Sequence, residues 1–580
     1  MTLVAIIFDR GEVAAYDGIS FSCGIWPAAA LASTGQTIAA LDPAVAIPWL
    51  RAHGVDLAQV EVVDVGAMLR AQGHSDGPAD LLYAAATLHP APRPEIRLVH
   101  ACFAMAQRKL EPVEHVVLTH TTRENARGLR VDRARAAELG TEYRDLREDA
   151  RRDLQVFLPH LDDRDIRSEP AFRSALEQRF GAAVTTTAMG STTGALGRAV
   201  DARQALMQFA NAAVEMQKIA DGPDCLLDFL SYYAAQTGRF SAPGFGVHSL
   251  PKHPHPRLRP LVRQREVILP SPGHWFAARD LNAIEPRVLA LLSGEDALLK
   301  TFRAGDDVYV WFAKSVWPGV VVEKRGENAD LRDVSKIAFV SLGYGTGLPA
   351  FHEQVMEAAP TSTEEDVVRA YDSFQAQFPK VQSAHREALG LLVRMAHGDH
   401  FTDCPLLGCS LTFDGSVLRV LLPTGRTVFY RNVRVTVDEV GDHSVWFSRV
   451  RPSRSSATIE NVPRFPRRKE HRFDDGVVRR CLAPHVLVQN ITQAVARDVI
   501  VHMQAELLEV KAEFAAIGLE IPFTVHDAIV AESLAVDWAW DDVQAVLADV
   551  MGRVPRTLPQ AMHGLPLASE AEIGPRERYG

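Results

Sequence analysis

The pattern of apolar and polar positions divides the chain into regions of different secondary structure. Short apolar runs at residues 3–8 (LVAIIF) and 60–65 (VEVVDV) have the length of strands, and the alanine-rich stretch 78–88 has that of a helix. Strands that alternate with helical stretches predict a small α/β domain over residues 1–115. The next region, residues 116–235, has the pattern of helices.

The second half of the chain contains clearer boundaries. A strand-like run, HWFAARD, ends at Asp280 and leads into a helix with Pro286 in its first turn. A long helical region follows to about residue 400, and residues 405–460 carry the turn signals of β-hairpins. After Pro484 a long helix is predicted to end near Gly518, and two short strands then meet at a tight turn around Asp527.

Composition adds the class of protein. The 580 residues are 47% hydrophobic and 23% charged, without repeats or low-complexity segments, which excludes disordered and fibrous classes and predicts several domains. The six cysteines form no CxxC pair, so neither a disulfide framework nor a zinc site is indicated. No segment has the length of a membrane span, and we expect a cytoplasmic protein without a membrane partner.

The charge balance alone argues mildly against a nucleic-acid partner. The chain has 62 basic and 72 acidic residues, a net charge of −10, whereas nucleic-acid binders are usually basic. The stretch 232–268 departs from this balance, because it holds six basic residues and one acid. It is rich in proline and glycine, so we expect a loop that lies against an anionic group or in solvent.

Three blocks carry the residue types that nucleotidyl transfer requires, namely carboxylates for divalent metals and cations for phosphates. They are DLNAIEPR at 280–287, RDVSKIAF at 332–339 with YG at 344–345, and VHDA at 525–528. On a helix, Arg332 and Lys336 lie four residues apart and face the same side. Taken singly, Asp280 and Asp527 are more typical of turns or helix caps, and the basic helix of a solvated face paired with Asp333.

Together the three blocks resemble motifs A, B and C of family A DNA polymerases, the class of bacterial DNA polymerase I and many bacteriophage replicative enzymes. The matches are DxxxIExR at 280–287, RxxxKxxxxxxxYG at 332–345 and VHD at 525–527. Three further segments resemble the family: TGR at 237–239 with LP at 250–251, LPTGR at 422–426, and QNITQAVARD at 489–498. The likeness covers residues 116–560.

The resemblance implies a role for each matched residue. Asp280, Asp527 and the carbonyl of Leu281 would hold two Mg²⁺ ions, for which Mn²⁺ can substitute, and Lys336 would act with the aspartates in catalysis. Nucleotide contacts are implied for Arg332 and Lys336 at the triphosphate, Tyr344 behind the template base, and Glu285 against a ribose 2′-hydroxyl. DNA contacts are implied for Arg239, Gln489, Gln493, His526 and Arg426.

Two positions depart from the family pattern. Val340 stands where an aromatic residue is usual, and Phe339 comes one position earlier. Because Phe339 follows Arg332 by seven residues, it either stacks on the nucleotide sugar or belongs to the core. Ala528 stands where motif C usually has a second acid, but both aspartates are present and activity is expected.

Some features also have an ordinary structural explanation. Glu285 is an acid near a helix N-terminus, where it complements the helix dipole. Gln489 and Gln493 fit a solvated helix face, and the basic run 464–472 either contacts a DNA backbone or is solvated. The histidine-rich segment 251–257 is predicted to be a loop because of its prolines.

Relatives often carry a 3′–5′ exonuclease domain that opens with Asp-x-Glu on a strand. Here Asp9 is followed by Gly11 at +2 and Glu12 at +3, and on one strand the +3 residue points away. We find no clear NxxFD or YxxxD signature before residues 121–132, which resemble the family's junction between exonuclease and thumb. We therefore expect a degenerate, inactive exonuclease-like domain of the ribonuclease H-like fold.

The combined expectation is a multidomain α/β protein of right-hand architecture. Its predicted parts are residues 1–115 (exonuclease-like), 116–235 (junction and thumb), 236–294 (palm, motif A), 295–400 (fingers, motif B) and 401–580 (palm with a β-rich insertion, motif C).

The expected function is that of a DNA polymerase that extends a primer 3′ end with dNTPs, without proofreading. Its setting would be phage DNA replication in a bacterial host, with a monomer acting on primer–template DNA and with replisome proteins as further partners. One alternative is a single-subunit RNA polymerase, against which Glu285 and the TGR segment argue. The other is an inactive primer–template-binding protein, against which Asp280, Asp527 and Lys336 argue.

Overall fold

The computed structural model describes most of the chain. The described residues are 3–9, 12–16, 21–24, 36–40, 46–47, 50, 55, 60–72 and 110–579, apart from 182–193, 228, 243–244, 253–254, 325, 327, 360, 438–442, 449–469 and 473–477. The predicted helix at 78–88 and most of the basic run 464–472 lie outside them, as does part of the histidine-rich segment. In the part that is described, no helix is long and apolar enough to cross a bilayer.

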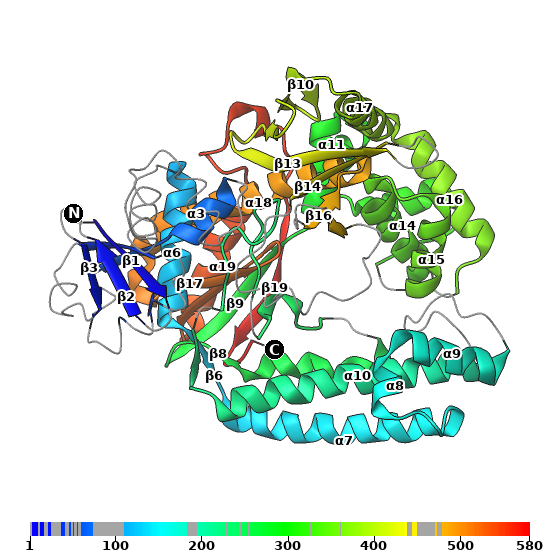
Figure 1. Ribbon diagram of the computed structural model, residues 1–580, viewed down its shortest axis with the longest axis horizontal. Helices are drawn as coiled ribbons and strands as arrows, with labels where there is room; N and C mark the ends of the chain where they lie inside the picture. The colour runs from blue at the N-terminus through cyan, green and yellow to red at the C-terminus, as the bar shows by residue number, and fades with distance from the viewer. Residues whose placement is uncertain are drawn as a thin grey trace.

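A five-stranded sheet forms the N-terminal part of the molecule (Figure 1). Its order is β3-β2-β1-β4-β5; β1 to β3 are antiparallel, and β4 and β5 run parallel to β1. The elements are β1 (Leu3–Asp9), β2 (Glu12–Tyr16), β3 (Phe21–Gly24), β4 (Gln36–Ala40), β5 (Val60–Asp64) and α3 (Val65–Ala71). The expected mixture of strand and helix is confirmed in these residues.

The hairpin between β1 and β2 corrects the sequence argument about Asp9 and Glu12. That argument placed both residues on one strand, where their spacing would separate them. In the structure β1 ends at Asp9, β2 begins at Glu12, and the register sets the two residues opposite each other. The argument from alternation along a single strand therefore does not apply to Asp9 and Glu12, which belong to different strands.

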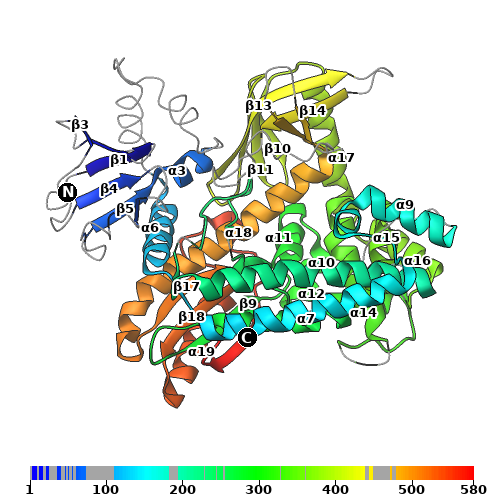
Figure 2. The same ribbon diagram turned by 60° about the horizontal axis from the view of Figure 1, so that its bottom comes forward.

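Helices dominate the next region, as predicted. Two long helices, α7 and α10, lie side by side along one edge of the molecule (Figures 1 and 2). A small sheet of order β7-β6-β8 joins their near ends to the rest of the chain. The elements are α6 (Pro112–Arg127), β6 (Leu129–Val131), α7 (Arg133–Phe157), α8 (Asp163–Arg167), α9 (Glu169–Phe180), α10 (Gly194–Asp221), β7 (Cys225–Leu226) and β8 (Ile268–Leu269).

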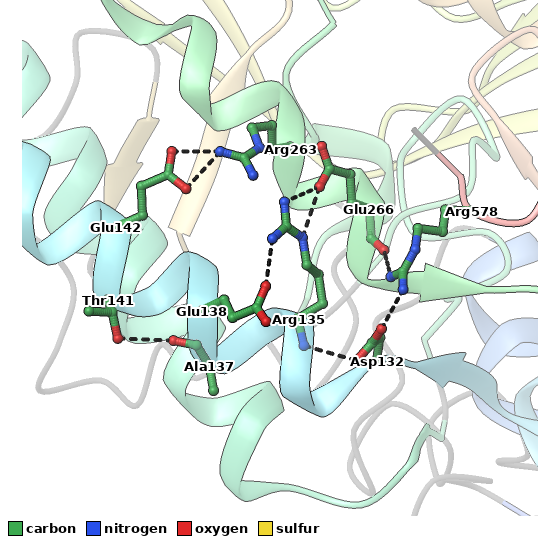
Figure 3. Close-up of polar contacts among 9 residues, drawn as sticks. All are labelled: Asp132, Arg135, Ala137, Glu138, Thr141, Glu142, Arg263, Glu266 and Arg578. Atoms are coloured by element: carbon green, nitrogen blue, oxygen red, sulfur yellow. Dashed lines mark hydrogen bonds and ion pairs between the residues drawn. The ribbon is translucent and has the colours of Figure 1, made fainter.

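The basic stretch 232–268 lies largely against carboxylates of the protein itself. It is less loop-like than predicted, because it contains the 3₁₀ helices η1 (Val247–Ser249) and η2 (Pro256–Val267). Figure 3 shows Arg263 of η2 paired with Glu142 of α7 at 2.7 Å. Further pairs are Arg257–Asp153, Lys252–Glu572 and Arg239–Glu285. Much of the positive charge of this stretch is thus neutralised within the fold.

A four-stranded sheet of order β17-β18-β9-β19 occupies the centre and holds the first and third sequence blocks. The strand before Asp280 and the two strands around Asp527 are confirmed. The long helix α18 continues into the 3₁₀ helix η5, which ends at Gly518 as predicted. The elements are β9 (His274–Leu281), α11 (Ile284–Ser293), α18 (Pro484–Val510), η5 (Lys511–Ile517), β17 (Glu520–Val525), β18 (Ala528–Leu534), α19 (Asp537–Gly552), η6 (Gln560–Met562) and β19 (Ser569–Arg576).

A group of helices on the far side from the N-terminal sheet carries the second block (Figure 1). It consists of α12 (Asp296–Arg303), α13 (Val308–Val316), α14 (Ala329–Ser341), η3 (Leu342–Tyr344), α15 (Leu348–Ala358), α16 (Glu364–Gln377) and α17 (Pro379–Ala396). Phe339 is 5% exposed and packs at ring centroid distances of 5.5 Å on Phe374 and Phe378. The structure therefore supports the second alternative, in which Phe339 is a core residue. Stacking on a nucleotide sugar would require its ring to leave this aromatic cluster.

A seven-stranded sheet of order β10-β11-β12-β13-β14-β16-β15 forms the β-rich insertion. The predicted hairpins are confirmed for the described residues, and the insertion begins at Phe401 and ends at Cys481. The strands are β10 (Phe401–Leu406), β11 (Cys409–Phe413), β12 (Leu418–Leu421), β13 (Thr427–Val437), β14 (His443–Ser448), β15 (Glu470–Arg472) and β16 (Val478–Cys481).

Candidate functional site

Two carboxylates, Asp280 and Asp527, meet at one edge of the central sheet. Asp280 stands near the end of β9, opposite Ala528, the first residue of β18. Asp527 belongs to the two-residue turn between β17 and β18, in which His526 has a left-handed φ of 56°. The carbonyl of Asp527 accepts a hydrogen bond from the amide of Leu281 (3.1 Å). This backbone contact ties the turn to the strand end, so the two sequence blocks become neighbours in space.

The site holds these carboxylates in an environment that disfavours two negative charges. Burial, followed by the charge of Asp527, raises the pKa of Asp280 to about 8. Burial also raises the pKa of Asp527. Lys252 opposes the shift at Asp280, but its ammonium already pairs with Glu572 (2.7 Å). A nearby cation would relieve the repulsion between the pair, which is the property expected of a divalent metal site.

The donor set fits the magnesium that the fold family implies. Carboxylate oxygens and backbone carbonyls are the ligands that Mg²⁺ takes from proteins, usually only one or two carboxylates at a time. Among the described residues, no group of three or more His, Cys, Asp and Glu side chains is arranged to hold a metal. Asp280 and Asp527 would therefore act with backbone oxygens and water, and Leu281 follows Asp280 directly in the chain.

A second cluster joins the first and second blocks. Glu285, in the first turn of α11, accepts hydrogen bonds from the Tyr344 hydroxyl and from Arg239. Tyr344 is buried, and burial together with the Glu285 charge raises its pKa well above the usual value. The tyrosine therefore stays neutral and can act as a donor. Three residues from distant parts of the sequence form one hydrogen-bonded group.

The helix predicted around Arg332 and Lys336 is confirmed as α14, and its two cations lie in different environments. Lys336 is exposed. Arg332 is mostly buried, donates from Nε (2.9 Å) and Nη2 (2.7 Å) to Asp307, and lies 5.3 Å from the Tyr309 ring centroid. Asp307, rather than Asp333 at 4.0 Å, is the main partner of Arg332. Lys336 is thus presented to solvent, whereas Arg332 is held by a carboxylate.

A cavity of about 210 Å³ lies beside Asp527, and Arg239, Glu285 and His526 are among the residues that line it. His248 contacts both sides of the 526–527 turn. Its Nε2 donates to the Thr524 carbonyl (2.7 Å), and its carbonyl lies 3.0 Å from His526 Nε2. Burial lowers the pKa of His248 to about 4, so its ring is neutral at neutral pH. The cavity therefore joins the carboxylate pair to the Glu285 cluster.

The position of Arg426 corrects the sequence analysis, which predicted that this residue contacts DNA. Its residue exposure is 9%, and its guanidinium pairs with Asp498 (2.7 Å). It also donates to the Tyr233 hydroxyl (2.5 Å) and to the carbonyls of Thr237 (2.9 Å) and Ala494 (3.1 Å). A guanidinium with this many internal acceptors is a buried structural group.

Arg426 belongs to a buried ionic network that motif comparison did not find. Arg497 pairs with Glu114 of α6, lies 3.3 Å from Asp498, and stacks with its guanidinium carbon 5.0 Å from the ring centroids of both Tyr232 and Tyr233. Burial alone would raise the pKa of Glu114, but the charges of Arg497 and Arg426 and the hydrogen bonds from Arg497 and Tyr232 together lower it. The network joins α6, the TGR turn, the LPTGR hairpin and α18. Arg426 and the pair Arg497–Asp498 lie in segments that resemble the family, whereas Glu114, Tyr232 and Tyr233 have no motif around them.

The two glutamines of α18 are half-buried. Gln489 and Gln493 lie one turn apart, so they face the same side of the helix. The structure brings neither of them into the Asp280–Asp527 pair or the Glu285 cluster. Residues that sequence reasoning missed are Glu114, His248, Lys252 and Glu572, each of which is a single acid, base or histidine without a motif around it.

Comparisons with known proteins agree with this arrangement. Residues 216–394 match the family model described as DNA polymerase family A. The chain is 27% identical over 189 residues to a DNA polymerase of Bacillus phage SP02, and 26% identical over 167 residues to a DNA polymerase of Mycobacterium phage D29. These matches cover 30% and 29% of this chain and 26% and 25% of the relatives, so the chain matches about a quarter of each relative's length.

The fold is also similar to a solved polymerase structure. The polymerase domain of Pol1 from M. smegmatis, in complex with DNA primer-template and dNTP, superposes with a TM-score of 0.66 at 15% identity. The superposition covers 99% of this chain and 95% of that one. This likeness to the solved structure concerns the fold. In sequence, residues 216–394 are similar to DNA polymerase family A, and the phage relatives are similar to about 30% of the chain.

Proposed function

We propose that the protein is a template-directed DNA polymerase that extends a primer 3′ end with dNTPs. The observation that carries the proposal is the meeting of Asp280, near the end of β9, with Asp527 in the turn between β17 and β18. Burial raises both pKa values there, and the charge of Asp527 raises the pKa of Asp280 further. Two buried carboxylates in contact destabilise the folded protein when both are ionised. A cation bound between them would remove this cost. The likeness of residues 216–394 to DNA polymerase family A supports a role of that cation in nucleotidyl transfer.

Asp280, Asp527 and the Leu281 carbonyl are the proposed ligands of two Mg²⁺ ions, for which Mn²⁺ can substitute. When bound, such a metal pair activates the primer hydroxyl and stabilises charge on the triphosphate. The protein residues around the pair have their own tasks. His248 and the Leu281 amide hold the 526–527 turn, and thereby orient Asp527 toward Asp280.

Glu285 and Tyr344 are proposed to select the sugar. A carboxylate held by two donors is fixed in position and presents its bulk to the 2′ side of a bound nucleotide. Lys336, exposed on α14, would bind the phosphates and act in catalysis, and Arg332 would join it by exchanging Asp307 for phosphate. Tyr344 would close behind the template base. Val340, 53% exposed, stands where the family's aromatic residue would be.

The primer–template is proposed to contact Arg239, His526, Gln489 and Gln493. The two glutamines are half-buried on α18, and amide groups can donate to the minor-groove acceptors shared by all base pairs. Arg239 lies at the Glu285 cluster and His526 is exposed beside Asp527. Arg426 is excluded from this set because its guanidinium is bound inside the protein.

The right-hand architecture is the proposed reading of the fold. The central sheet corresponds to the palm (236–294 and 401–580, with its β-rich insertion), α12 to α17 to the fingers (295–400), and the α7–α10 pair to the thumb (within 116–235). For residues 1–115, the strand order β3-β2-β1-β4-β5 supports a ribonuclease H-like, exonuclease-like domain.

Absence of proofreading is also proposed, and it rests now on the missing NxxFD and YxxxD signatures rather than on the spacing of Asp9 and Glu12. The mixed phage and bacterial relatives support a role in phage DNA replication in a host cytoplasm. There the protein would act as a monomer, with replisome proteins as further partners.

Primer extension tests the proposal. A labelled primer–template is incubated with Mg²⁺ and either dNTPs or rNTPs, for the natural protein and for Asp280→Asn. We expect extension with dNTPs only, and its loss in the variant. Preferential use of rNTPs would indicate an RNA polymerase, and binding of primer–template without extension would indicate an inactive binding protein; either result contradicts the proposal.

A further inference from the structure

A buried arginine of the N-terminal domain contacts the polymerase core. Arg70 of α3 is 4% exposed. Its guanidinium lies 3.8 Å from Asp64 of its own domain and also reaches the polymerase core. Nη2 donates to the carbonyl of Tyr232 (2.7 Å), and Nε donates to the carbonyl of Tyr233 (3.1 Å). In Figures 1 and 2, α3 lies on the side of the N-terminal sheet that faces the rest of the molecule. A planar guanidinium on two successive carbonyls is a directional contact that a lysine cannot reproduce.

The carbonyls that Arg70 binds belong to a turn with an unusual backbone. Tyr233 has a left-handed φ of 58°, which is uncommon for a bulky residue and is kept only where surrounding contacts impose it. Ser231 and Ser241 exchange two backbone hydrogen bonds (2.7 and 3.0 Å), and Ala234 donates to the Arg239 carbonyl (2.9 Å). Residues 231–241 therefore form a closed turn with Arg239 on its returning arm.

The same turn is held from the core side through its side chains. The Tyr232 hydroxyl donates to Glu114, and the Tyr233 hydroxyl accepts from Arg426 (2.5 Å). Gly238 has a φ of 84°, and a Cβ there would lie 3.1 Å from the Tyr233 ring, so the turn is closely packed. The buried network thus holds the rings, while Arg70 of the N-terminal domain holds the backbone.

Arg239 connects the turn to the proposed sugar gate. Its guanidinium pairs with Glu285, which also accepts from the Tyr344 hydroxyl. A shift of the turn backbone would move Arg239 relative to Glu285, because Ala234 and Arg239 are joined by a backbone hydrogen bond. The position of the gate carboxylate is therefore linked, through one short turn, to the N-terminal domain.

We propose that Arg70 is a positioning residue for nucleotide selection, so that the N-terminal domain is a structural part of the polymerase site as well as a separate fold. The inference rests on the proposed polymerase function. Without the guanidinium, two buried carbonyls lose their donors and the strained turn relaxes. Arg239 then holds Glu285 less firmly, and discrimination between deoxyribose and ribose falls while the catalytic aspartates are untouched.

The chain offers a matched control in the same domain contact. Arg431 of β13 donates from Nε to the carbonyl of Gln72 (2.8 Å), directly after α3, whereas the donor to the carbonyls of Tyr232 and Tyr233 is Arg70. Arg431→Met therefore weakens docking of the N-terminal domain without removing the donors of the turn. Arg70→Met removes those donors and keeps an unbranched side chain, and Arg70→Lys keeps one charge and a shorter reach.

Two measurements on the full chain test the proposal. The first is the ratio of kcat/KM for a dNTP to that for the matching rNTP in single-nucleotide extension. We expect this ratio to fall about tenfold in Arg70→Met, less in Arg70→Lys, and to stay within about twofold in Arg431→Met. An equal loss for both nucleotides in Arg70→Met, or the same fall in Arg431→Met, would show a general folding effect and overturn the proposal.

The second measurement does not require activity. Amide hydrogen exchange of residues 230–242 in the free protein should rise in Arg70→Met and stay near the natural rate in Arg431→Met, with α18 unchanged in both. If the natural protein extends no primer, the proposed function fails while this exchange result still reports on the turn. Unchanged exchange at 230–242 in Arg70→Met overturns the positioning role, whatever the activity.

Discussion

Replacement of Arg426 by methionine tests whether this residue is a buried structural group or a DNA contact. The change removes a guanidinium that neutralises Asp498, which is 2% exposed, and that satisfies two main-chain carbonyls and the Tyr233 hydroxyl. Asp498 would keep Thr424 at 2.5 Å and Arg497 at 3.3 Å as partners. The hydrophobic side chain of methionine replaces the volume but none of the hydrogen bonds.

The size of the effect follows from these partners. Removing one member of a buried ion pair costs about 3–5 kcal/mol, because the remaining charge is left in a low-dielectric site. Arg497 remains near Asp498 and lowers that cost, whereas two unsatisfied carbonyls add to it at about 1 kcal/mol or more each. We therefore expect the free energy of unfolding to fall by about 3–4 kcal/mol, a large part of the roughly 5–15 kcal/mol of a typical domain.

Urea unfolding followed by circular dichroism measures this loss. The matched control is Arg419→Met on β12, which removes an exposed pair with Asp414 (2.7 Å) in the same sheet and should cost less than about 1 kcal/mol. The reasoning is refuted if Arg426→Met unfolds like the natural protein. It is also refuted if the variant mainly loses affinity for primer–template and its salt dependence, as a removed phosphate contact would.

Three further outcomes are expected. In metal-free buffer, Asp280→Asn should be more stable than the natural protein, and the difference should grow as pH rises from about 4 to 8 and then level off. The raised pKa means that the folded state binds this proton more tightly than the unfolded state, so stability is lost on deprotonation, with an upper limit of about 6 kcal/mol in urea melts. A pH-independent difference would contradict the repulsion. Glu285→Ala should increase ribonucleotide incorporation by about tenfold or more in single-nucleotide extension, and unchanged sugar selectivity would remove its gate role. Mismatched primer termini should remain uncut by the purified protein; removal of the mismatch that is lost in Asp9→Ala would reveal an active exonuclease.

Local patterns were sufficient for several features of this chain. The alternation before Asp280, the turn at His526–Asp527 and the helical spacing after Pro484 each depend on neighbouring residues, so they were predicted and are found in the structure. The three ordered motifs likewise gave the resemblance to DNA polymerase family A, which agrees with the family match over residues 216–394. The error at Asp9 and Glu12 had a local cause: the sequence argument placed both residues on one strand, whereas β1 ends at Asp9 and β2 begins at Glu12.

Other features depended on contacts between residues far apart in the chain. Motif comparison treated Arg426 as a DNA contact, yet its acceptors come from positions 233, 237, 494 and 498, and only folding brings them around one guanidinium. The core position of Phe339 was undecided for the same reason, since its ring partners lie on α13 and α16 and just before α17.

The sequence by itself determined the elements, the order of the motifs and the chemistry of the aspartates, because these follow from residue type and local spacing. The tertiary structure alone decided which charged side chains are exposed and which are paired inside the protein. The net charge and the basic stretch 232–268 could not separate these cases, since Arg263 and Arg257 are paired with carboxylates of α7. Charge is a property of a residue, whereas its availability depends on every group that folding places within a few ångströms of it.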